Sequence, residues 1–120
     1  MATVVITGGS RGIGAEAVRQ FAARGDRVYF LYEKEHEKAT AVAAETGATA
    51  LCCDVADSQA VKNTFAQIPD VDILICNAGI CHSGLLSMLA ESDWDRLFDV
   101  NVKGVYNCVC AAMPAFLQKH

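Results

Sequence analysis

A cluster of glycines near the amino terminus has the spacing of a site that approaches a ligand closely. Gly8, Gly12 and Gly14 follow an apolar run and open a helical pattern. So many glycines carry a conformational entropy cost that stability alone does not justify. A glycine turn between a strand and a helix lets a diphosphate reach the backbone, and the helix N-terminus supplies free N–H groups. The stretch therefore predicts a diphosphate-binding turn, with a tight turn that binds nothing as the alternative.

The six cysteines could bind a metal or form disulfides, but their spacing favours neither. None of the spacings is Cys-x-x-Cys, and no histidine pair follows at zinc-finger spacing. Cys52, Cys53 and Cys76 lie in or beside apolar runs. We therefore expect reduced, buried cysteines that act as small apolar residues, and no metal site.

The elements that must position the glycine turn follow from the spacing of apolar residues. Continuous apolar runs, typical of strands buried on both faces, predict strands over 2–6, 28–32, 48–53 and 71–76. Apolar residues at helical spacing predict helices over 13–24, 35–45 and 57–68. Strands that alternate with helices predict βαβ units with right-handed crossovers and a parallel sheet.

After residue 76 the alternation changes. Residues 77–79 predict a turn, and 80–91 form a longer loop. From about Ser92, apolar residues from Trp94 to Leu117 recur at helical spacing, which predicts a long helix that is kinked or ends near Pro114. Asn101 lies on this apolar stripe, where a buried amide needs hydrogen-bond partners.

Composition and charge narrow the class of protein. The 120 residues fit one domain, and 52% apolar with 20% charged residues is typical of a folded globular chain. A net charge of −4 argues against nucleic acid as the main partner. No signal peptide or membrane-length apolar run is present in this sequence, so we expect a cytoplasmic protein that does not contact membranes.

Four segments, in order, resemble the short-chain dehydrogenase/reductase family, with 3-oxoacyl-carrier-protein reductases as the nearest group. They are residues 7–14, 53–55, 77–79 and Asn101. The resemblance implies an α/β fold, a Rossmann-like doubly wound parallel sheet with strand order 3-2-1-4. It also implies that residues 1–120 form a dinucleotide-binding domain that corresponds to the amino-terminal half of the family's length.

The resemblance further implies roles for individual residues. Asp54 would accept a hydrogen bond from the adenine amine, with turn capping as the alternative. Asn101 would be catalytic by holding a water in a proton relay, with a satisfied core asparagine as the alternative. The implied cofactor-binding residues are Gly8, Ser10, Arg11, Gly12, Ile13, Gly14, Tyr32, Asp54, Val55, Asn77, Ala78 and Gly79.

The end of the second expected strand bears on the choice of cofactor. By the family pattern, the acidic residue that selects NAD would stand at Tyr32, which is not acidic. Arg11 is suited to a 2′-phosphate and Lys34 could assist, whereas the Glu33 carboxylate would repel a phosphate. We therefore expect NADP, with NAD as the alternative.

The family's chemistry is hydride transfer between the nicotinamide and a carbonyl or alcohol substrate, with a Tyr-x-x-x-Lys pair and a serine. None of Tyr29, Tyr32 and Tyr106 has a lysine four residues later. We therefore hypothesise that this chain alone is inactive. A non-catalytic dinucleotide-binding module and an assembly fragment remain the alternatives.

Two further expectations concern contacts beyond the cofactor. Cys81, His82 and Ser83, in the loop after the fourth strand, are candidate contacts for a substrate that the sequence does not identify. The fourth strand would be an exposed sheet edge, which predicts a homo-oligomer formed through that edge or through the last helix.

Overall fold

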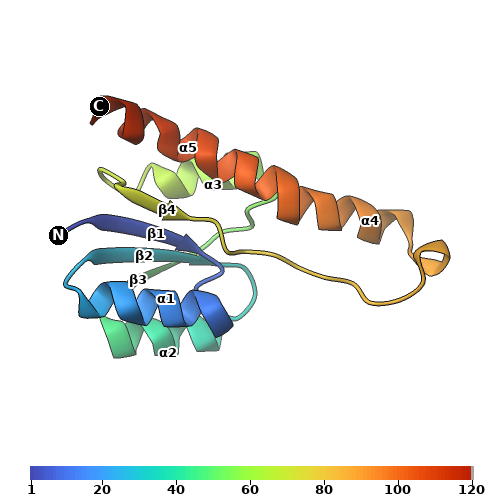
Figure 1. Ribbon diagram of the computed structural model, residues 1–120, viewed down its shortest axis with the longest axis horizontal. Helices are drawn as coiled ribbons and strands as arrows, with labels where there is room; N and C mark the ends of the chain where they lie inside the picture. The colour runs from blue at the N-terminus through green and yellow to red at the C-terminus, as the bar shows by residue number, and fades with distance from the viewer. Residues whose placement is uncertain (120) are drawn as a thin grey trace.

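A parallel sheet forms the centre of the molecule in the computed structural model, which describes residues 1–119 (Figure 1). The strand order is β3-β2-β1-β4, and every neighbouring pair is parallel, which confirms the expected topology. All residues of β1 are buried, because helices cover both faces of the sheet. The strands are β1 (Thr3–Thr7), β2 (Arg27–Tyr32), β3 (Thr49–Cys52) and β4 (Ile73–Ile75).

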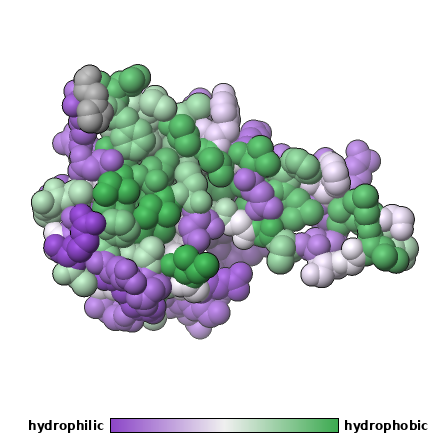
Figure 2. Space-filling view, viewed as in Figure 1, coloured by the Kyte–Doolittle hydropathy of each residue, from purple (hydrophilic) through white to green (hydrophobic). Residues whose placement is uncertain are grey.

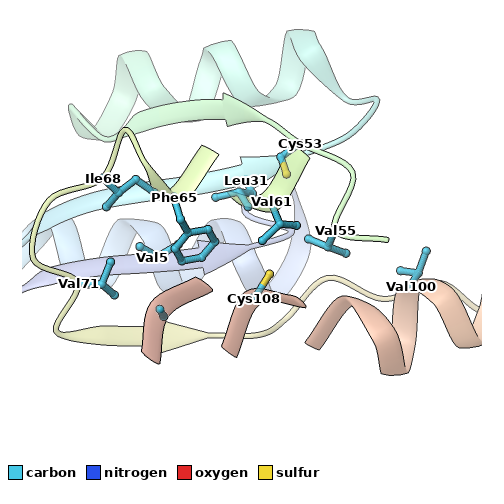
Figure 3. Packing of buried hydrophobic residues seen from close by; sticks show 11 residues of the cluster. Val5, Leu31, Cys53, Val55, Val61, Phe65, Ile68, Val71, Val100 and Cys108 are labelled. Atoms are coloured by element: carbon cyan, nitrogen blue, oxygen red, sulfur yellow. The ribbon is translucent and has the colours of Figure 1, made fainter. Parts of the chain in front are cut away.

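Two helical layers cover the sheet. On one face lie α1 (Gly12–Ala23) and α2 (His36–Thr46), and on the other lie α3 (Ser58–Phe65) and α5 (Gly104–Gln118) (Figure 1). Each layer has its own core, and Figure 3 shows the one between the sheet and α3 and α5. Phe65 and Val61 of α3 pack there beside Val5 of β1 and Leu31 of β2.

Single residues at the helix ends, a capping aspartate and a glycine, set where two of these helices begin or end. Asp57 caps α3, since its Oδ1 accepts hydrogen bonds from the backbone N–H groups of Gln59 and Ala60, both at 3.1 Å. Gly47 ends α2 in the left-handed conformation. Both ends agree with the sequence, although α3 stops at Phe65, short of the expected residue 68.

The long carboxyl-terminal helix is divided differently from the expectation. It comprises α4 (Glu91–Phe98), a π-helical segment η2 (Asp99–Lys103) and α5, while the preceding loop contains the short 3₁₀ turn η1 (Leu86–Met88). α5 continues through Pro114 to Gln118, so the expected end of the helix near Pro114 was wrong. Pro114 lies on the solvent-exposed side, where water can satisfy the carbonyl that the proline leaves unpaired.

The apolar stripe of this helix does not form the core. Trp94, Phe98, Tyr106 and Leu117 are exposed, and the buried face of α5 instead carries small or polar residues such as Cys108 and Ala112. Small residues let α5 approach the sheet closely, and they leave the bulky residues on the outer face. Figure 2 shows apolar side chains gathered on the face where β4 and α5 lie.

The cysteine expectation is correct only in part. Cys53 and Cys108 are buried, as expected, whereas the other four cysteines are exposed. Cys52 and Cys76 are exposed because they lie on or just after β3 and β4, the two edge strands of the sheet. Within residues 1–119 no cluster of three potential metal ligands occurs, and no helix is long and apolar enough to span a membrane.

Candidate functional site

A cavity of about 540 Å³ lies at the carboxyl ends of the strands. This is the edge at which open α/β sheets bind ligands. Of the residues expected from sequence to bind a cofactor, all but Gly14 line it. Those lining residues are Gly8, Ser10, Arg11, Gly12, Ile13, Tyr32, Asp54, Val55, Asn77, Ala78 and Gly79.

The glycine turn shapes one wall of the cavity. Gly12 has φ +58°, and a Cβ there would meet no atom within 4 Å, so this position opens onto free space. The hydrogen-bonding of α1 starts with the Ala15 N–H and the Arg11 carbonyl. The N–H groups of the first turn are therefore available to an anion, as at other helix N-termini.

Gly14 does not line the cavity but lies against the backbone of the glycine turn. A Cβ at Gly14 would lie 2.0 Å from the Gly8 carbonyl oxygen and 2.6 Å from Asn77 Nδ2. Only glycine fits such an approach without a backbone shift. Gly14 thus lets α1 begin directly against the turn after β1, whereas the other expected cofactor-binding residues line the cavity.

The turn after β4 is attached to the end of β1. The Thr7 hydroxyl accepts hydrogen bonds from the backbone N–H groups of Asn77 and Ala78, each at 2.9 Å, and Asn77 Nδ2 donates to the Gly8 carbonyl at 3.1 Å. A buried threonine at the end of β1 thus fixes residues 77–79 beside the glycine turn. Sequence analysis did not assign this role to Thr7.

Asp54 follows β3 and stabilises its own turn. Its Oδ1 accepts from the Ala56 N–H at 3.0 Å, and its Oδ2 accepts from Arg96 at 3.0 Å. Burial opposes the charged form, but these two hydrogen bonds and the Arg96 charge outweigh it, so the pKa of Asp54 is lowered. The turn alternative for Asp54 is therefore present in the structure, and each carboxylate oxygen can still accept a further hydrogen bond.

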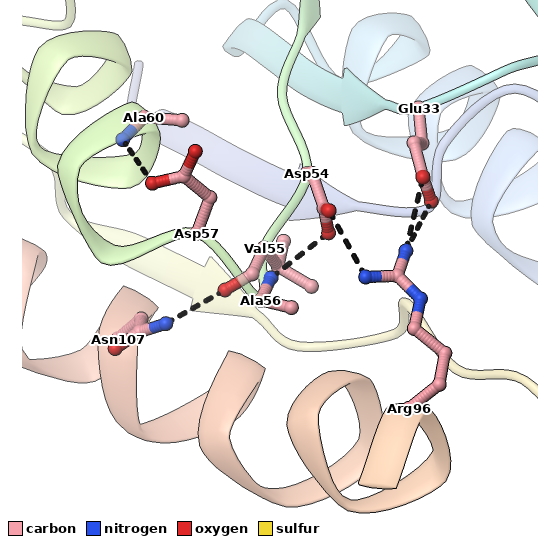
Figure 4. A network of polar contacts seen from close by, with 8 residues as sticks. All are labelled: Glu33, Asp54, Val55, Ala56, Asp57, Ala60, Arg96 and Asn107. Carbon is pink, nitrogen blue, oxygen red and sulfur yellow. Dashed lines mark hydrogen bonds and ion pairs between the residues drawn. The ribbon is translucent and has the colours of Figure 1, made fainter. Parts of the chain in front are cut away.

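Arg96, on α4, joins two carboxylates at the same end of the cavity (Figure 4). One of its terminal nitrogens lies 2.9 Å from each oxygen of Glu33, and the other bonds Asp54. Side-chain hydrogen bonding to Asp54 and the neighbouring carboxylates raise the pKa of Arg96, so it stays charged. All three residues line the cavity.

Further charged groups surround the ends of β1 and β2. Arg11 Nη1 lies 4.0 Å from Glu35 Oε1, with the Arg11 side chain largely exposed and that of Glu35 half-buried. The Tyr32 hydroxyl forms a hydrogen bond of 2.8 Å with His36 Nδ1 at the start of α2. Tyr32 stands where the family pattern has an acidic residue, so a phenol and not a carboxylate lies at this end of the cavity.

Asn101 lies in the π-helical segment and, contrary to the sequence expectation, is exposed. Its Oδ1 accepts from the Ile80 N–H at 2.9 Å, and its Nδ2 donates to the Ile80 carbonyl at 2.8 Å. Asn101 does not line the cavity, but it fixes the start of the loop segment after Gly79, where Ile80 lines the cavity. Cys81, His82 and Ser83 continue this segment as exposed residues outside the lining.

The buried asparagine of the carboxyl-terminal helix is Asn107, which the sequence analysis missed. Its Nδ2 donates to the Val55 carbonyl at 2.8 Å and so connects α5 to the turn that carries Asp54 (Figure 4). Arg96 was also missed. No signal in the sequence points to its role, because Asp93 and Asp99, three positions away, offer Arg96 partners on its own helix.

A second hollow, of about 580 Å³, lies between α3 and α5 and includes Phe65 and Pro114. It contains neither a glycine turn nor the carboxyl ends of strands. We therefore place the candidate site at the sheet edge.

Comparisons with known proteins agree with this geometry. Residues 2–120 match the family model described as short chain dehydrogenase. The chain is 37% identical to the 3-oxoacyl-[acyl-carrier-protein] reductase FabG of Staphylococcus aureus, over 98% of this chain and 51% of the relative. It is 45% identical to the cyclic-di-GMP-binding biofilm dispersal mediator protein of Escherichia coli, over 88% of this chain and 44% of the relative.

A solved structure, that of BdcA in complex with NADPH, superposes with a TM-score of 0.89 and 43% identity. It matches 92% of this chain and 46% of BdcA. The chain thus spans about half the length of the curated relatives it matches.

Proposed function

The chain belongs to the short chain dehydrogenase family, and from the geometry of its cavity we propose that residues 1–120 form a dinucleotide-binding domain for NADP(H). The observation that carries the proposal is the open space at Gly12, in front of the unpaired N–H groups of α1. An alanine methyl group would occupy that space, and the free N–H groups and positive dipole end of the helix beside it suit the charge of a diphosphate.

The cavity residues divide the dinucleotide between them in this proposal. Gly12, Ser10 and Ile13 hold the diphosphate at the start of α1, and Arg11 faces the phosphate on the adenosine ribose. Asp54, with the adjacent Val55 N–H, receives the adenine. The turn at residues 77–79 supports the second ribose, and Thr7 fixes that turn to β1.

NADPH, rather than NADH, is the proposed cofactor. Tyr32 is not acidic, and Arg11 and Lys34 both line the cavity near the end of β2. The relative BdcA was solved with NADPH. NADH remains the alternative because Glu33 and Glu35 also line this end.

The reaction we propose is hydride transfer between NADP(H) and a carbonyl or alcohol substrate. The bound cofactor supplies or accepts the hydride. In this proposal Asn101 fixes the backbone at Ile80 through its two hydrogen bonds. The π-helical segment that contains Asn101 holds a main-chain group in place, and this group binds a water of the proton relay. Because none of its tyrosines is followed by a lysine four residues later, we expect the 120-residue chain to bind cofactor without turnover.

Calorimetric titration of the chain with NADPH and with NADH tests the proposal. Saturable binding, tighter for NADPH, is the expected result. Absence of binding by either cofactor would contradict the proposal and favour an assembly role. Oxidation of NADPH in the presence of a carbonyl substrate would contradict the expected lack of turnover.

A further inference from the structure

The side chain of Arg96 reaches from α4 to the ends of two strands. It bonds both oxygens of Glu33, which follows β2, and one oxygen of Asp54, which follows β3 (Figure 4). No residue of α4 is buried, so its attachment to this end of the cavity is through polar contacts and through the helix that continues into η2 and α5. The ion pairs of Arg96 attach α4 to the sheet.

Glu33 stands where a carboxylate affects the choice between NADH and NADPH. In doubly wound folds, an acidic group near the end of the second strand accepts a hydrogen bond from the ribose 2′-hydroxyl. The same charge repels a 2′-phosphate, because juxtaposed like charges are unfavourable. Glu33 lines the cavity directly after Tyr32, so its free carboxylate would favour NADH over NADPH.

Arg96 changes the charge and the hydrogen-bond acceptors that Glu33 presents to a ligand in the cavity. A single guanidinium nitrogen lies 2.9 Å from each of the two carboxylate oxygens, so Arg96 occupies acceptor lone pairs of Glu33 and offsets its negative charge. The basic groups lining this end are Arg11, Lys34 and Arg96, and the acidic groups are Glu33, Glu35 and Asp54. Without Arg96 the end of the cavity would carry an excess of negative charge.

We infer that Arg96 determines cofactor preference by engaging Glu33, so that the cavity accepts a 2′-phosphate and withholds an acceptor from a 2′-hydroxyl. The inference rests on the proposed function of the cavity. Arg96 acts through Glu33 and is a positioning residue. Its replacement should therefore change the ratio of affinities for NADH and NADPH. If Arg96 only held α4 in place, its replacement would leave that ratio unchanged.

The test compares dissociation constants for NADPH and NADH, which differ only in the 2′-phosphate, in the 120-residue chain and four variants. Arg96→Gln frees Glu33, and Glu33→Gln removes the carboxylate while Arg96 keeps Asp54. The double variant Arg96→Gln/Glu33→Gln removes both groups. Arg19→Gln is the matched control, because it removes one positive charge from the exposed ion pair with Glu45, outside the cavity.

We expect Arg96→Gln to shift the affinity ratio about tenfold toward NADH, a change equivalent to about 1.4 kcal/mol. The double variant should return the ratio to near the wild-type value, and Glu33→Gln should keep the preference for NADPH. Arg19→Gln should leave the ratio unchanged. Circular dichroism and thermal unfolding establish that each variant is folded.

Three results would overturn the inference while leaving the proposed function intact. The first is that the wild-type chain binds NADPH but Arg96→Gln leaves the ratio of NADH and NADPH affinities unchanged. The second is that the double variant stays shifted toward NADH. The third is that Glu33→Gln loses the preference for NADPH. A wild-type chain that binds neither cofactor would remove the proposed function and the inference together.

Discussion

Replacing Gly12 by alanine separates the cost of an unusual backbone conformation from the loss of a binding site. Gly12 has φ +58° and Gly25, at the far end of α1, has φ +89°. A Cβ at either glycine would meet nothing within 4 Å. Left-handed backbone costs an L-residue about 1–2 kcal/mol, so Gly12→Ala and Gly25→Ala should lower the free energy of unfolding by similar amounts.

The two variants should differ in cofactor binding, because only the Gly12 methyl group would enter the cavity. A phosphate kept away from the start of α1 loses hydrogen bonds to its N–H groups, and a hydrogen bond to a charged group contributes about 1.5–3 kcal/mol. Loss of one such bond predicts about tenfold to a hundredfold weaker binding of NADPH by Gly12→Ala. Gly25→Ala should bind NADPH like the wild type.

Calorimetric titration with NADPH gives the affinity, and urea unfolding of the same samples gives the stability. The reasoning is refuted if Gly12→Ala binds NADPH as tightly as Gly25→Ala does. It is equally refuted if both variants lose binding in proportion to their lost stability, since the effect would then be on folding and not on the site.

Three other changes have defined outcomes. Asn107→Ala should lower the free energy of unfolding by about 1–3 kcal/mol in urea titrations, because it leaves a buried carbonyl unsatisfied, and a loss below about 0.5 kcal/mol would show that the bond is dispensable. The lowered pKa of Asp54 means that its contribution to stability is full above about pH 4, near its unfolded pKa, and is lost as the pH falls through the folded value. The melting temperature of Asp54→Asn should therefore fall less on acidification than that of the wild type, and parallel curves would contradict this. We also expect self-association through the exposed outer face of α5, so Leu117→Glu should lower the mass measured by light scattering, and a wild-type monomer at all concentrations would exclude it.

The sheet and its ligand edge could be predicted from sequence because their signals are local. A fully buried strand such as β1 must be a continuous apolar run, and a glycine turn between strand and helix has few other uses. Strand order then follows from the handedness of βαβ connections and the family resemblance. These constraints do not depend on side-chain packing elsewhere.

The carboxyl-terminal helix was harder to predict because burial depends on what surrounds it. The apolar residues from Trp94 to Leu117 recur at the helical spacing of a core face, yet α5 packs through Gly104, Cys108 and Ala112. A Cβ at Gly104 would lie 2.7 Å from Val55 Cγ2, so close approach, rather than hydrophobicity, selects the packed face. Periodicity does not report that distance.

Arg96 illustrates the same limit for the site. Its contacts with Glu33 and Asp54 span 63 and 42 positions of the chain. Pattern reasoning pairs charges that are three or four residues apart on a helix, but it does not identify partners at that separation. The structure therefore adds a charge to the cavity that the cofactor argument from Arg11, Glu33 and Lys34 lacked.

The attachment of β4 has a consequence for the order in which the molecule opens. β4 is short and, among the strands of residues 1–119, pairs with β1 alone, and the turn after β4 is joined to Thr7 by hydrogen bonds that span 70 and 71 positions. Closing the long segment of chain between β1 and β4 carries an entropy cost, and this cost is smaller for the other strand pairs, which are closer in sequence. Local unfolding should therefore begin at β4, and its amide protons should exchange with deuterium before those of β1 and β2. Because opening β4 also releases the turn at residues 77–79, a ligand bound there would slow exchange in β4 most.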